Sequence, residues 1–315
     1  MHVDGVSVMG IRLIKRRPGS ARHVSAPARG MRSRAHRVSS VVLCALAMAA
    51  ITTVPASASR QPPRWAPASE ATIHPGVQTF TGELQCTANF VFYDSRSVYL
   101  GQAAHCSGRF GQEGDGCTVD SLPLGTPVEI EGTGYAGTIV YNSWLTMQRV
   151  GERSAAACSG NDFALIRLLD SLESKVNPSL PFWGGPTTSG GRSSFGDRVY
   201  SYGNSGLRAG IGELSPKYGI NTTPIHHAIG DTTGWGGNYG GWTHYITTLT
   251  PGIFGDSGSP VLDARGRGLG NLSTVSLDGS NGIADLSKAL KYMKAHTKLD
   301  AIQFAKGTES FSPLL

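Results

Sequence analysis

Short hydrophobic runs separated by turn residues fill most of the chain from about residue 81. The runs are rich in β-branched and aromatic residues, and none of them carries a long helical period. Examples are NFVFYD (89–94), SVYLGQAA (97–104), PVEIEG (127–132), GTIVYN (137–142), FALIRL (163–168), DRVYSYG (197–203), HYITTL (244–249) and SPVLDA (259–264). Many short strands joined by turns are typical of a sandwich or barrel, and not of β-α-β units. The pattern therefore predicts an all-β domain over 81–315.

One segment near the C-terminus has the period of a helix instead. In ADLSKALKYMKAH (284–296), Leu286, Leu290 and Met293 recur at three- and four-residue spacing, with lysines at other positions. Such spacing puts apolar side chains on one face of a helix. We expect an amphipathic C-terminal helix with one buried face.

The N-terminal part has a different composition. Three arginines in MRSRAHR (31–37) precede the apolar run VVLCALAMAAITTVPASA (41–58), which ends in small residues. This order is typical of a secretory signal peptide. A membrane anchor is the alternative, but the run is short and contains Pro55. We interpret 1–58 as leader and signal peptide, with Met31 as a possible true start, and 59–80, rich in Pro, Ala, Ser and Thr, as a linker or short pro-segment without a core of its own.

Removal of 1–58 changes the charge balance. That segment holds nine of the 28 basic residues and one of the 22 acidic ones, so the remainder has a formal net charge of −2. A nucleic-acid-binding surface is therefore not expected. The remaining length of about 257 residues is enough for one large all-β domain or two small barrels.

Cysteine usage agrees with export from the cell. Cys44 lies in the predicted signal, which leaves Cys86, Cys106, Cys117 and Cys158. An even number in an exported chain predicts two disulfides, but spacing alone leaves three pairings open. No two of the four form a C-x-x-C pair, so a zinc site is disfavoured and no metal or cofactor is expected.

Candidate chemistry centres on PGIFGDSGSPV (251–261). Ser257 becomes a nucleophile only if a base lies within hydrogen-bond reach and a further group orients that base. His105 follows an apolar run and precedes Cys106, so that a crosslink would fix it at a strand end. Asp162 opens the run FALIRL at the rim of a core. Taken alone, His105 is equally compatible with an ordinary loop histidine, Asp162 with a turn aspartate, and the segment around Ser257 with a simple turn.

The order of the three residues is more informative than any one of them. The sequence His105, Asp162, Ser257 is the order of chymotrypsin-like enzymes and differs from those of α/β-hydrolases and subtilisins. The α/β-hydrolase motif G-x-S-x-G is missing because residue 259 is serine.

Three blocks of the sequence resemble the signature blocks of trypsin/chymotrypsin-like serine proteases, especially secreted bacterial members. The blocks are AAHC (103–106), DFALIRL (162–168) and GDSGSP (255–260), and the resemblance covers most of 81–297. It implies a double β-barrel with a cleft between the barrels, a C-terminal helix, and a secreted serine-type endopeptidase.

The resemblance also implies roles for single residues. Ser257 would be the nucleophile and His105 the general base, with Asp162 orienting the imidazole. The N–H groups of Gly255 and Ser257 would form the oxyanion hole. Ser273, in GNLSTVS, stands where the family has a serine that supports the buried acid.

The disulfide pairing comes from the same comparison. Cys86 and Cys106 resemble the pair that ties the strand before the histidine to the histidine loop. This assignment leaves Cys117 and Cys158 as the second pair.

The chain departs from the family pattern around the nucleophile. Ser259 replaces a common glycine, and Asp256 resembles a carboxylate whose cationic partner the sequence does not identify. Pro251 stands where trypsins carry the aspartate that binds a basic side chain, and Val275 aligns with a pocket-wall glycine. We therefore expect cleavage after apolar residues.

Two other functions are also compatible with the sequence. An inactive homologue that only binds proteins would be expected to lack a triad member, and an esterase would use the same acyl-transfer site. The prediction is an extracellular endopeptidase, a monomer acting on polypeptides, with no nucleic-acid partner and no membrane contact after signal removal.

Overall fold

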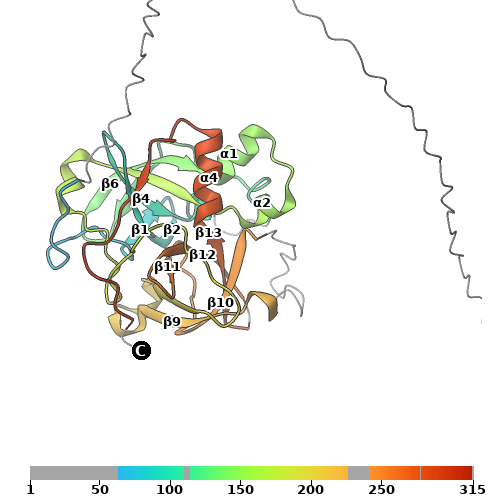
Figure 1. The fold of residues 1–315 in the computed structure, drawn as a ribbon. Coiled ribbons are helices and arrows are strands. Elements are labelled where there is room, and N and C mark those ends of the chain that lie inside the picture. Colours follow the sequence, from blue (N-terminus) through green and yellow to red (C-terminus); the bar gives the residue numbers. More distant parts are fainter. Residues whose placement is uncertain (1–62, 110–113, 226–240, 277, 314–315) are drawn as a thin grey trace, which may run out of the picture. The chain divides into compact units, whose positions relative to one another are not determined.

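The computed structural model describes residues 63–109, 114–225, 241–276 and 278–313. The predicted leader and signal peptide (1–58) and the first residues of the predicted linker lie outside this part. The described residues form two antiparallel sheets with few helices, as the all-β prediction requires (Figure 1).

The first sheet has eight strands in the order β14-β3-β4-β7-β6-β5-β1-β2. Their bounds are β1 (Gln78–Thr81), β2 (Leu84–Thr87), β3 (Val91–Tyr93), β4 (Val98–Gln102), β5 (Pro127–Ile130), β6 (Gly134–Asn142), β7 (Ala164–Leu168) and β14 (Gln303–Phe304). Val91, Leu100, Val128, Ile139 and Ile166 come from five different strands and share one buried core. Strands that turn one face toward a common interior enclose it as a barrel does.

The second sheet is a closed barrel in the order β10-β13-β12-β11-β8-β9. Its strands are β8 (Arg198–Tyr202), β9 (Pro216–Asn221), β10 (Thr243–Leu249), β11 (Pro260–Asp263), β12 (Gly268–Val275) and β13 (Ser280–Asp285). A small apolar core that includes Val199, Val261 and Ile283 fills it. The predicted fold class, an all-β double barrel with a C-terminal helix, is confirmed, although the hydrogen bonds of the first sheet end at β2 and β14 without closing a ring.

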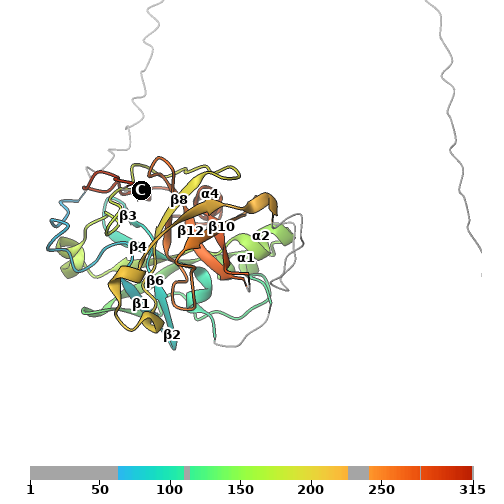
Figure 2. The ribbon, with the colours of Figure 1, turned by 90° about the horizontal axis from the view of Figure 1, so that it is seen from below.

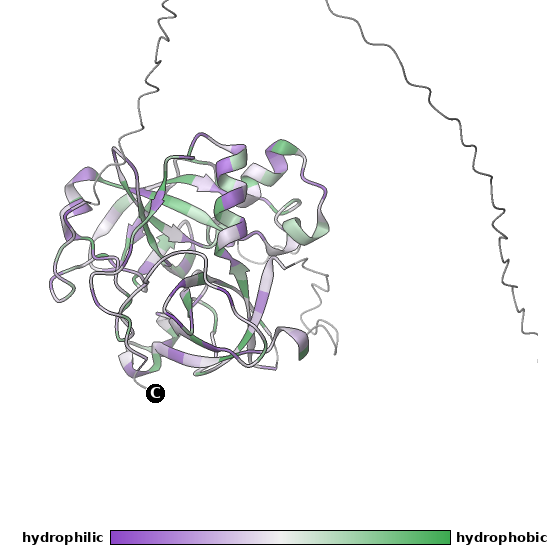
Figure 3. Ribbon diagram, in the orientation of Figure 1, coloured by the Kyte–Doolittle hydropathy of each residue, from purple (hydrophilic) through white to green (hydrophobic). Residues whose placement is uncertain are grey.

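A third, aromatic-rich core joins the two sheets to the C-terminal helix. Phe92 of the first sheet, Phe163 just before β7 and Tyr200 of the second sheet belong to the same buried cluster as residues of helix α4 (Leu286–His296). Leu286 and Met293 are fully buried and Leu290 is partly buried, so the predicted apolar face is the one that packs inward. Figure 3 accordingly colours α4 in both hydrophilic and hydrophobic bands.

Two short helices between β6 and β7 were not predicted from the sequence. Helix α1 (Ser143–Val150) begins at Asn142, whose side chain accepts a 2.8 Å hydrogen bond from the N–H of Trp144. Helix α2 (Ala155–Gly160) begins after Ser154, which caps it in the same way. Asn and Ser are favoured N-caps because their oxygens satisfy free amides of the first turn. Figures 1 and 2 both show α1 and α2 on the side of the molecule where α4 lies.

The predicted linker differs from expectation in its described part. Ile73 and Val77 are buried in the core of the first sheet, and Trp65 packs edge-on against Tyr93 with ring centroids 6.0 Å apart. The backbone of Ile73 also forms an isolated bridge with Val176. Segment 63–80 therefore belongs structurally to the domain, although its three apolar contact residues, Trp65, Ile73 and Val77, form no continuous hydrophobic run in the sequence.

No helix in the described portion of the chain is both long and apolar enough to cross a membrane.

Candidate active site

His105 is held on a short crosslinked turn. Strand β4 ends at Gln102, and the 3₁₀ helix η1 (Ala104–Ser107) carries the histidine. Its neighbour Cys106 is bonded to Cys86 of β2. On the other side, the Asn142 side chain donates a 3.0 Å hydrogen bond to the carbonyl of Ala104. Because both neighbours of His105 are tied to other elements, its backbone position is fixed.

Asp162 lies buried just before β7 and contacts His105 through both carboxylate oxygens. Oδ1 accepts the backbone N–H of His105 at 2.9 Å, and Oδ2 lies 2.7 Å from His105 Nδ1. The hydroxyl of Ser273, on β12 of the other barrel, donates to the same Oδ2 at 2.5 Å. A carboxylate can only accept, so Nδ1 carries the proton and Nε2 is left with its lone pair.

The same contacts set the charge states of the two groups. Burial by itself would lower the pKa of His105, but the charge and hydrogen bond of Asp162 outweigh it, and the pKa is raised. Burial would likewise raise the pKa of Asp162, yet the charge of His105 and the hydrogen bonds from His105 and Ser273 lower it. The arrangement therefore stabilises an imidazolium next to an ionised carboxylate.

Ser257 sits in a tight turn between the segment 251–256 and β11. Its carbonyl accepts a 2.8 Å hydrogen bond from Thr87 N–H of β2, and the next residue, Gly258, donates to the carbonyl of Leu272 at 2.7 Å. Gly258 has φ +87°, and a Cβ there would collide with the carbonyl of Thr87. Glycine is thus required immediately after Ser257, because the nucleophile turn runs directly against the first barrel.

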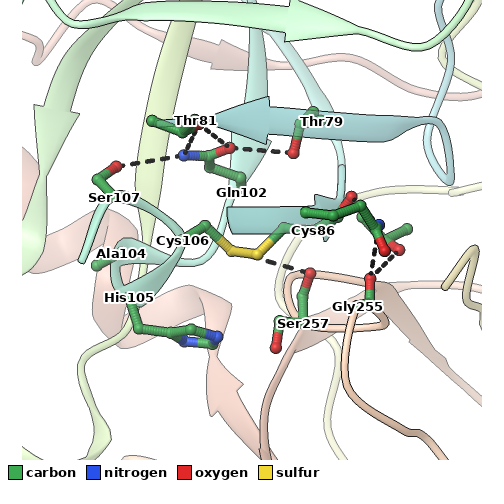
Figure 4. The surroundings of a disulfide bond; sticks show 12 residues. Thr79, Thr81, Cys86, Gln102, Ala104, His105, Cys106, Ser107, Gly255 and Ser257 are labelled. Atoms are coloured by element: carbon green, nitrogen blue, oxygen red, sulfur yellow. Dashed lines mark hydrogen bonds between the residues drawn. A yellow bond between two sulfur atoms is a disulfide. The ribbon is translucent and has the colours of Figure 1, made fainter. Parts of the chain in front are cut away.

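The two candidate catalytic groups face the same space. Figure 4 shows the ring of His105 and the side chain of Ser257 on the same side of the Cys86–Cys106 disulfide. Cys106 Sγ lies 4.0 Å from the carbonyl oxygen of Ser257, which is a packing contact because a disulfide sulfur has no proton to donate. Both residues lie in the described part of the chain, and there no hydrogen bond joins Ser257 Oγ to Nε2 of His105. Such bonds are often loose before substrate binds.

The backbone beside Ser257 leaves two N–H groups without protein acceptors. Among the described residues, neither Gly255 N–H nor Ser257 N–H donates to a protein atom. The carbonyl of Phe254 is turned toward Ser205 Oγ, at 2.5 Å, and a trans peptide directs the N–H of Gly255 the opposite way. Gly255 has φ +89°, where a side chain would meet Gln85. Two free amides next to a serine hydroxyl can bind an oxyanion.

Asp256 has the cationic partners that the sequence could not identify. Its Oδ2 lies 2.5 Å from Arg208 Nη2 and 3.0 Å from Lys217 Nζ, and all three side chains are buried. The N–H groups of Ser205 and Ile253 also donate to this carboxylate. Burial and the neighbouring Arg208 lower the pKa of Lys217, although Asp256 opposes the shift. The cluster fixes the turn that precedes Ser257.

Arg208 and Lys217 gave no signal in the sequence. Arg208 ends the short 3₁₀ helix η3 (Gly206–Arg208), which precedes a second one, η4 (Gly212–Leu214), and Lys217 lies on β9. Surface loops and strands contain such residues routinely.

The remaining predicted residues differ in their exposure to solvent. Pro251 is exposed, Val275 at the end of β12 is half-buried, and Ser259 is buried with no hydrogen-bond partner for its hydroxyl in the described residues. The second disulfide joins Cys117 to Cys158 of α2, so both bonds have the pairing that the resemblance implied.

Metal binding finds no support in the described clusters of ligand-type residues. Two groups have ligand atoms close together, Cys86 with His105 and Cys106, and Asp115 with Cys117 and Cys158. All four cysteines are disulfide-bonded and offer no thiolate.

Two barrels of this connectivity with a C-terminal helix form the chymotrypsin-like fold, and the chain resembles bacterial serine proteases of that class. No family model matches it, and no curated protein does. Solved structures that are similar include Thermobifida fusca Protease A (16% identity, 75% of this chain and 99% of that chain, TM-score 0.45). A glutamic acid-specific serine protease is also similar (16% identity, 74% of this chain and 100% of that chain, TM-score 0.48). So is Cellulomonas bogoriensis chymotrypsin (16% identity, 74% of this chain and 98% of that chain, TM-score 0.44).

Proposed function

We propose that this protein is a secreted serine endopeptidase in which Ser257, His105 and Asp162 hydrolyse peptide bonds through an acyl-enzyme. The observation that carries the proposal is the contact between Asp162 Oδ2 and His105 Nδ1 at 2.7 Å. It holds the imidazole in the tautomer whose Nε2 is a base on the side of Ser257.

The reaction follows from these contacts. Ser257 Oγ attacks the carbonyl carbon of the scissile bond while its proton passes to His105 Nε2. The carbonyl oxygen becomes an oxyanion that accepts the free N–H groups of Gly255 and Ser257. The imidazolium then gives its proton to the leaving amine nitrogen as the C–N bond breaks. A water molecule then attacks the acyl carbon while His105 Nε2 takes its proton. His105 returns that proton to Ser257 Oγ as the acyl C–Oγ bond breaks and the carboxylic acid product leaves.

The charge distribution supports a substrate without a basic side chain before the scissile bond. Pro251 brings no carboxylate, and its carbonyl accepts a 3.0 Å hydrogen bond from Arg208. Asp256, in the same segment, is already engaged by two cations. An unpaired Lys or Arg head group buried there would cost several kcal/mol, so an apolar residue is favoured.

The predicted signal at 1–58 and the two disulfides support an extracellular location. We also propose that the protein acts as a monomer on polypeptides.

The test combines covalent labelling with cleavage-site mapping. A fluorophosphonate should label the wild-type protein at Ser257 and should not label Ser257→Ala. Incubation with a mixed peptide library, read by mass spectrometry, should show cleavage after apolar residues. If Ser257 is labelled but the protein hydrolyses only simple esters and no peptides, the protein is an esterase and not a peptidase. If Ser257 is not labelled and no peptide is cleaved, the protein is an inactive homologue that only binds its partners.

A further inference from the structure

The peptide groups on either side of Gly255 are held through their carbonyls by side chains from outside the nucleophile turn. The hydroxyl of Ser205, the residue before η3, donates a 2.5 Å hydrogen bond to the carbonyl of Phe254. The hydroxyl of Thr87, on β2 of the first barrel, donates a 2.8 Å hydrogen bond to the carbonyl of Gly255. Gln85 of the same strand donates from Nε2 to this second carbonyl at 3.1 Å (Figure 4). Two consecutive carbonyls of the turn therefore have fixed directions.

Both hydroxyls are themselves held in place. Ser205 is buried, its N–H donates to Asp256 Oδ1 at 3.0 Å, and its Oγ also accepts the N–H of Leu207 at 3.1 Å. Thr87 is fully buried, and its Oγ1 also accepts the N–H of Asn204 at 3.1 Å. A hydroxyl that accepts one backbone N–H and donates to one carbonyl has little freedom to rotate. The two donors therefore offer the turn fixed points of attachment.

These attachments matter because the residue between the two carbonyls is glycine. Gly255 has φ +89°, and a Cβ there would collide with Gln85 Oε1 and lie 2.8 Å from Ser205 Oγ, so no side chain fits. Glycine, however, restricts the rotation of its neighbouring peptide planes less than any other residue. A rotation of the planar peptide between Phe254 and Gly255 would exchange the directions of its carbonyl and its N–H. Hydrogen bonds, more than local sterics, must therefore keep the N–H of Gly255 in position.

We propose that Ser205 and Thr87 are positioning residues of the oxyanion hole, whose hydroxyls keep the N–H of Gly255 directed at the oxygen of the substrate carbonyl. This inference rests on the proposed peptidase function, in which Gly255 and Ser257 donate to the oxyanion. Ser205 follows β8 of the second barrel and Thr87 lies on β2 of the first. The geometry of the hole therefore depends on the contact between the two barrels.

The first test uses variants that differ only in the hydroxyl of Thr87. Thr87→Val replaces it by a methyl group and keeps the 2.8 Å hydrogen bond from the backbone N–H of Thr87 to the carbonyl of Ser257. For the substrate that the wild type hydrolyses fastest, kcat should fall by about tenfold or more with little change in KM, because the hole binds a charge that is absent from the bound substrate. Thr87→Ser keeps the hydroxyl and should retain most of the wild-type kcat. Ser205→Ala should behave like Thr87→Val.

A peptidyl trifluoromethyl ketone with the sequence of the best substrate reports on the hole directly. Ser257 Oγ adds to its ketone carbon, the serine proton passes to His105 Nε2, and the ketone oxygen becomes the oxyanion of a hemiketal. Carbon-13 NMR of the hemiketal carbon follows the protonation of this oxygen as pH falls. In Thr87→Val and Ser205→Ala the midpoint should move to higher pH by about one pH unit for each tenfold loss of kcat, because the hole stabilises the anion less.

Thr79→Val is the matched control for general damage to the first barrel. Thr79 is fully buried on β1, and its Oγ1 donates to Gln102 Oε1 at 3.2 Å. This variant should leave kcat and the hemiketal midpoint unchanged, whatever stability it loses in a denaturant titration. If Ser205→Ala fails to fold, as judged by circular dichroism, the comparison of Thr87→Val with Thr87→Ser decides the proposal.

The outcomes separate the positioning role from the peptidase function. If Thr87→Val and Ser205→Ala lose only stability, with kcat and the hemiketal midpoint like those of Thr79→Val, the positioning role is wrong and the peptidase stands. Equal impairment of Thr87→Ser and Thr87→Val would also exclude a role for the hydroxyl. A wild type that hydrolyses only esters would overturn the peptidase, while the hemiketal midpoint would still decide the positioning role. A wild type that hydrolyses nothing and forms no hemiketal would overturn both.

Discussion

Two buried aspartates lie near the nucleophile, and they differ in the partners that compensate their charge. Asp162 is compensated by His105 and by hydrogen bonds from the Ser273 hydroxyl and the His105 backbone. Asp256 is compensated by the side chains of Arg208 and Lys217. A buried carboxylate is tolerated only with such partners, and both sites satisfy that requirement.

The difference lies in what the partners can do. Imidazole gains and loses a proton near neutral pH, so the charge facing Asp162 changes during a reaction. A guanidinium keeps its proton at any accessible pH, so the charge facing Asp256 does not disappear. We infer that the Asp162 site serves proton transfer, and that the Asp256 site keeps the turn of Gly255 and Ser257 in one conformation.

The largest effect is expected from variants that remove the catalytic side chains and leave the Asp256 cluster intact. Ser257→Ala and His105→Ala should each lower kcat/KM for a peptide substrate by about 10⁴-fold or more, because nucleophile and base act as one unit. The double variant should lose no more than either single one. Circular dichroism should show all three folded. Wild-type-like hydrolysis by Ser257→Ala would exclude the proposed mechanism.

Replacing the first aspartate tests its effect on the histidine. Asp162→Asn should lower kcat by about 10³–10⁴-fold, because an amide no longer holds the required tautomer or stabilises the imidazolium. The pH dependence should change too. In the wild type the active form is neutral His105, so kcat/KM should rise with pH through a midpoint above 6.5, since the pKa of His105 is raised.

In Asp162→Asn the carboxylate charge is gone while His105 stays buried, so the midpoint of the pH dependence of kcat/KM should move to lower pH.

The contributions of His105 and Asp162 to the stability of the wild-type fold depend on pH with opposite signs. Through His105, the ion pair contributes its full stabilisation of the fold below pH 6.5, and this stabilisation is lost as pH rises past the raised pKa of His105. Through Asp162, whose pKa is lowered, it contributes above about pH 4 and is lost as pH falls further. A midpoint that stays in place in Asp162→Asn would show that another group titrates.

Replacing the second aspartate, Asp256, should affect the stability of the fold more than the catalytic reaction. Asp256→Asn leaves Arg208 and Lys217 buried beside a neutral amide and should lower the free energy of unfolding by about 3–5 kcal/mol. Denaturant titration measures this. The companion variant Asp263→Asn serves as control, because Asp263 pairs with the more exposed Arg267 and should lose less. Equal losses in both variants would remove the distinction between the two aspartates.

The sequence predicted the strand-rich fold and the candidate triad because each depends on local pattern. Alternating strands, the AAHC and GDSGSP blocks and the helix at 284–296 are all contained in short windows. The contacts of Arg208 and Lys217 with Asp256, and of Asn281 with Gly252, depend instead on how loops and strands of the second barrel come together in the fold. No short window contains both partners, so these residues looked like ordinary polar positions.

The same limit applies to the segment that was predicted as a linker. Ile73 and Val77 are separated by a histidine, a proline and a glycine, and only the folded first barrel gives each a place in the core. Composition alone therefore underestimated how far the domain extends toward the N-terminus.

The smallest expected effect concerns the hydroxyl that links the two barrels at Asp162. Ser273→Ala removes one hydrogen bond to a charged group, which is worth about 1.5–3 kcal/mol, but water can reach the half-buried position and replace part of it. We therefore expect a loss of about tenfold in kcat/KM, carried mostly by kcat. Ser201→Ala is the matched control, because Ser201 is buried in the same barrel and its hydroxyl has no partner among the described residues. A loss in Ser273→Ala no greater than in Ser201→Ala would mean that the imidazole and backbone of His105 hold Asp162 without help from the second barrel.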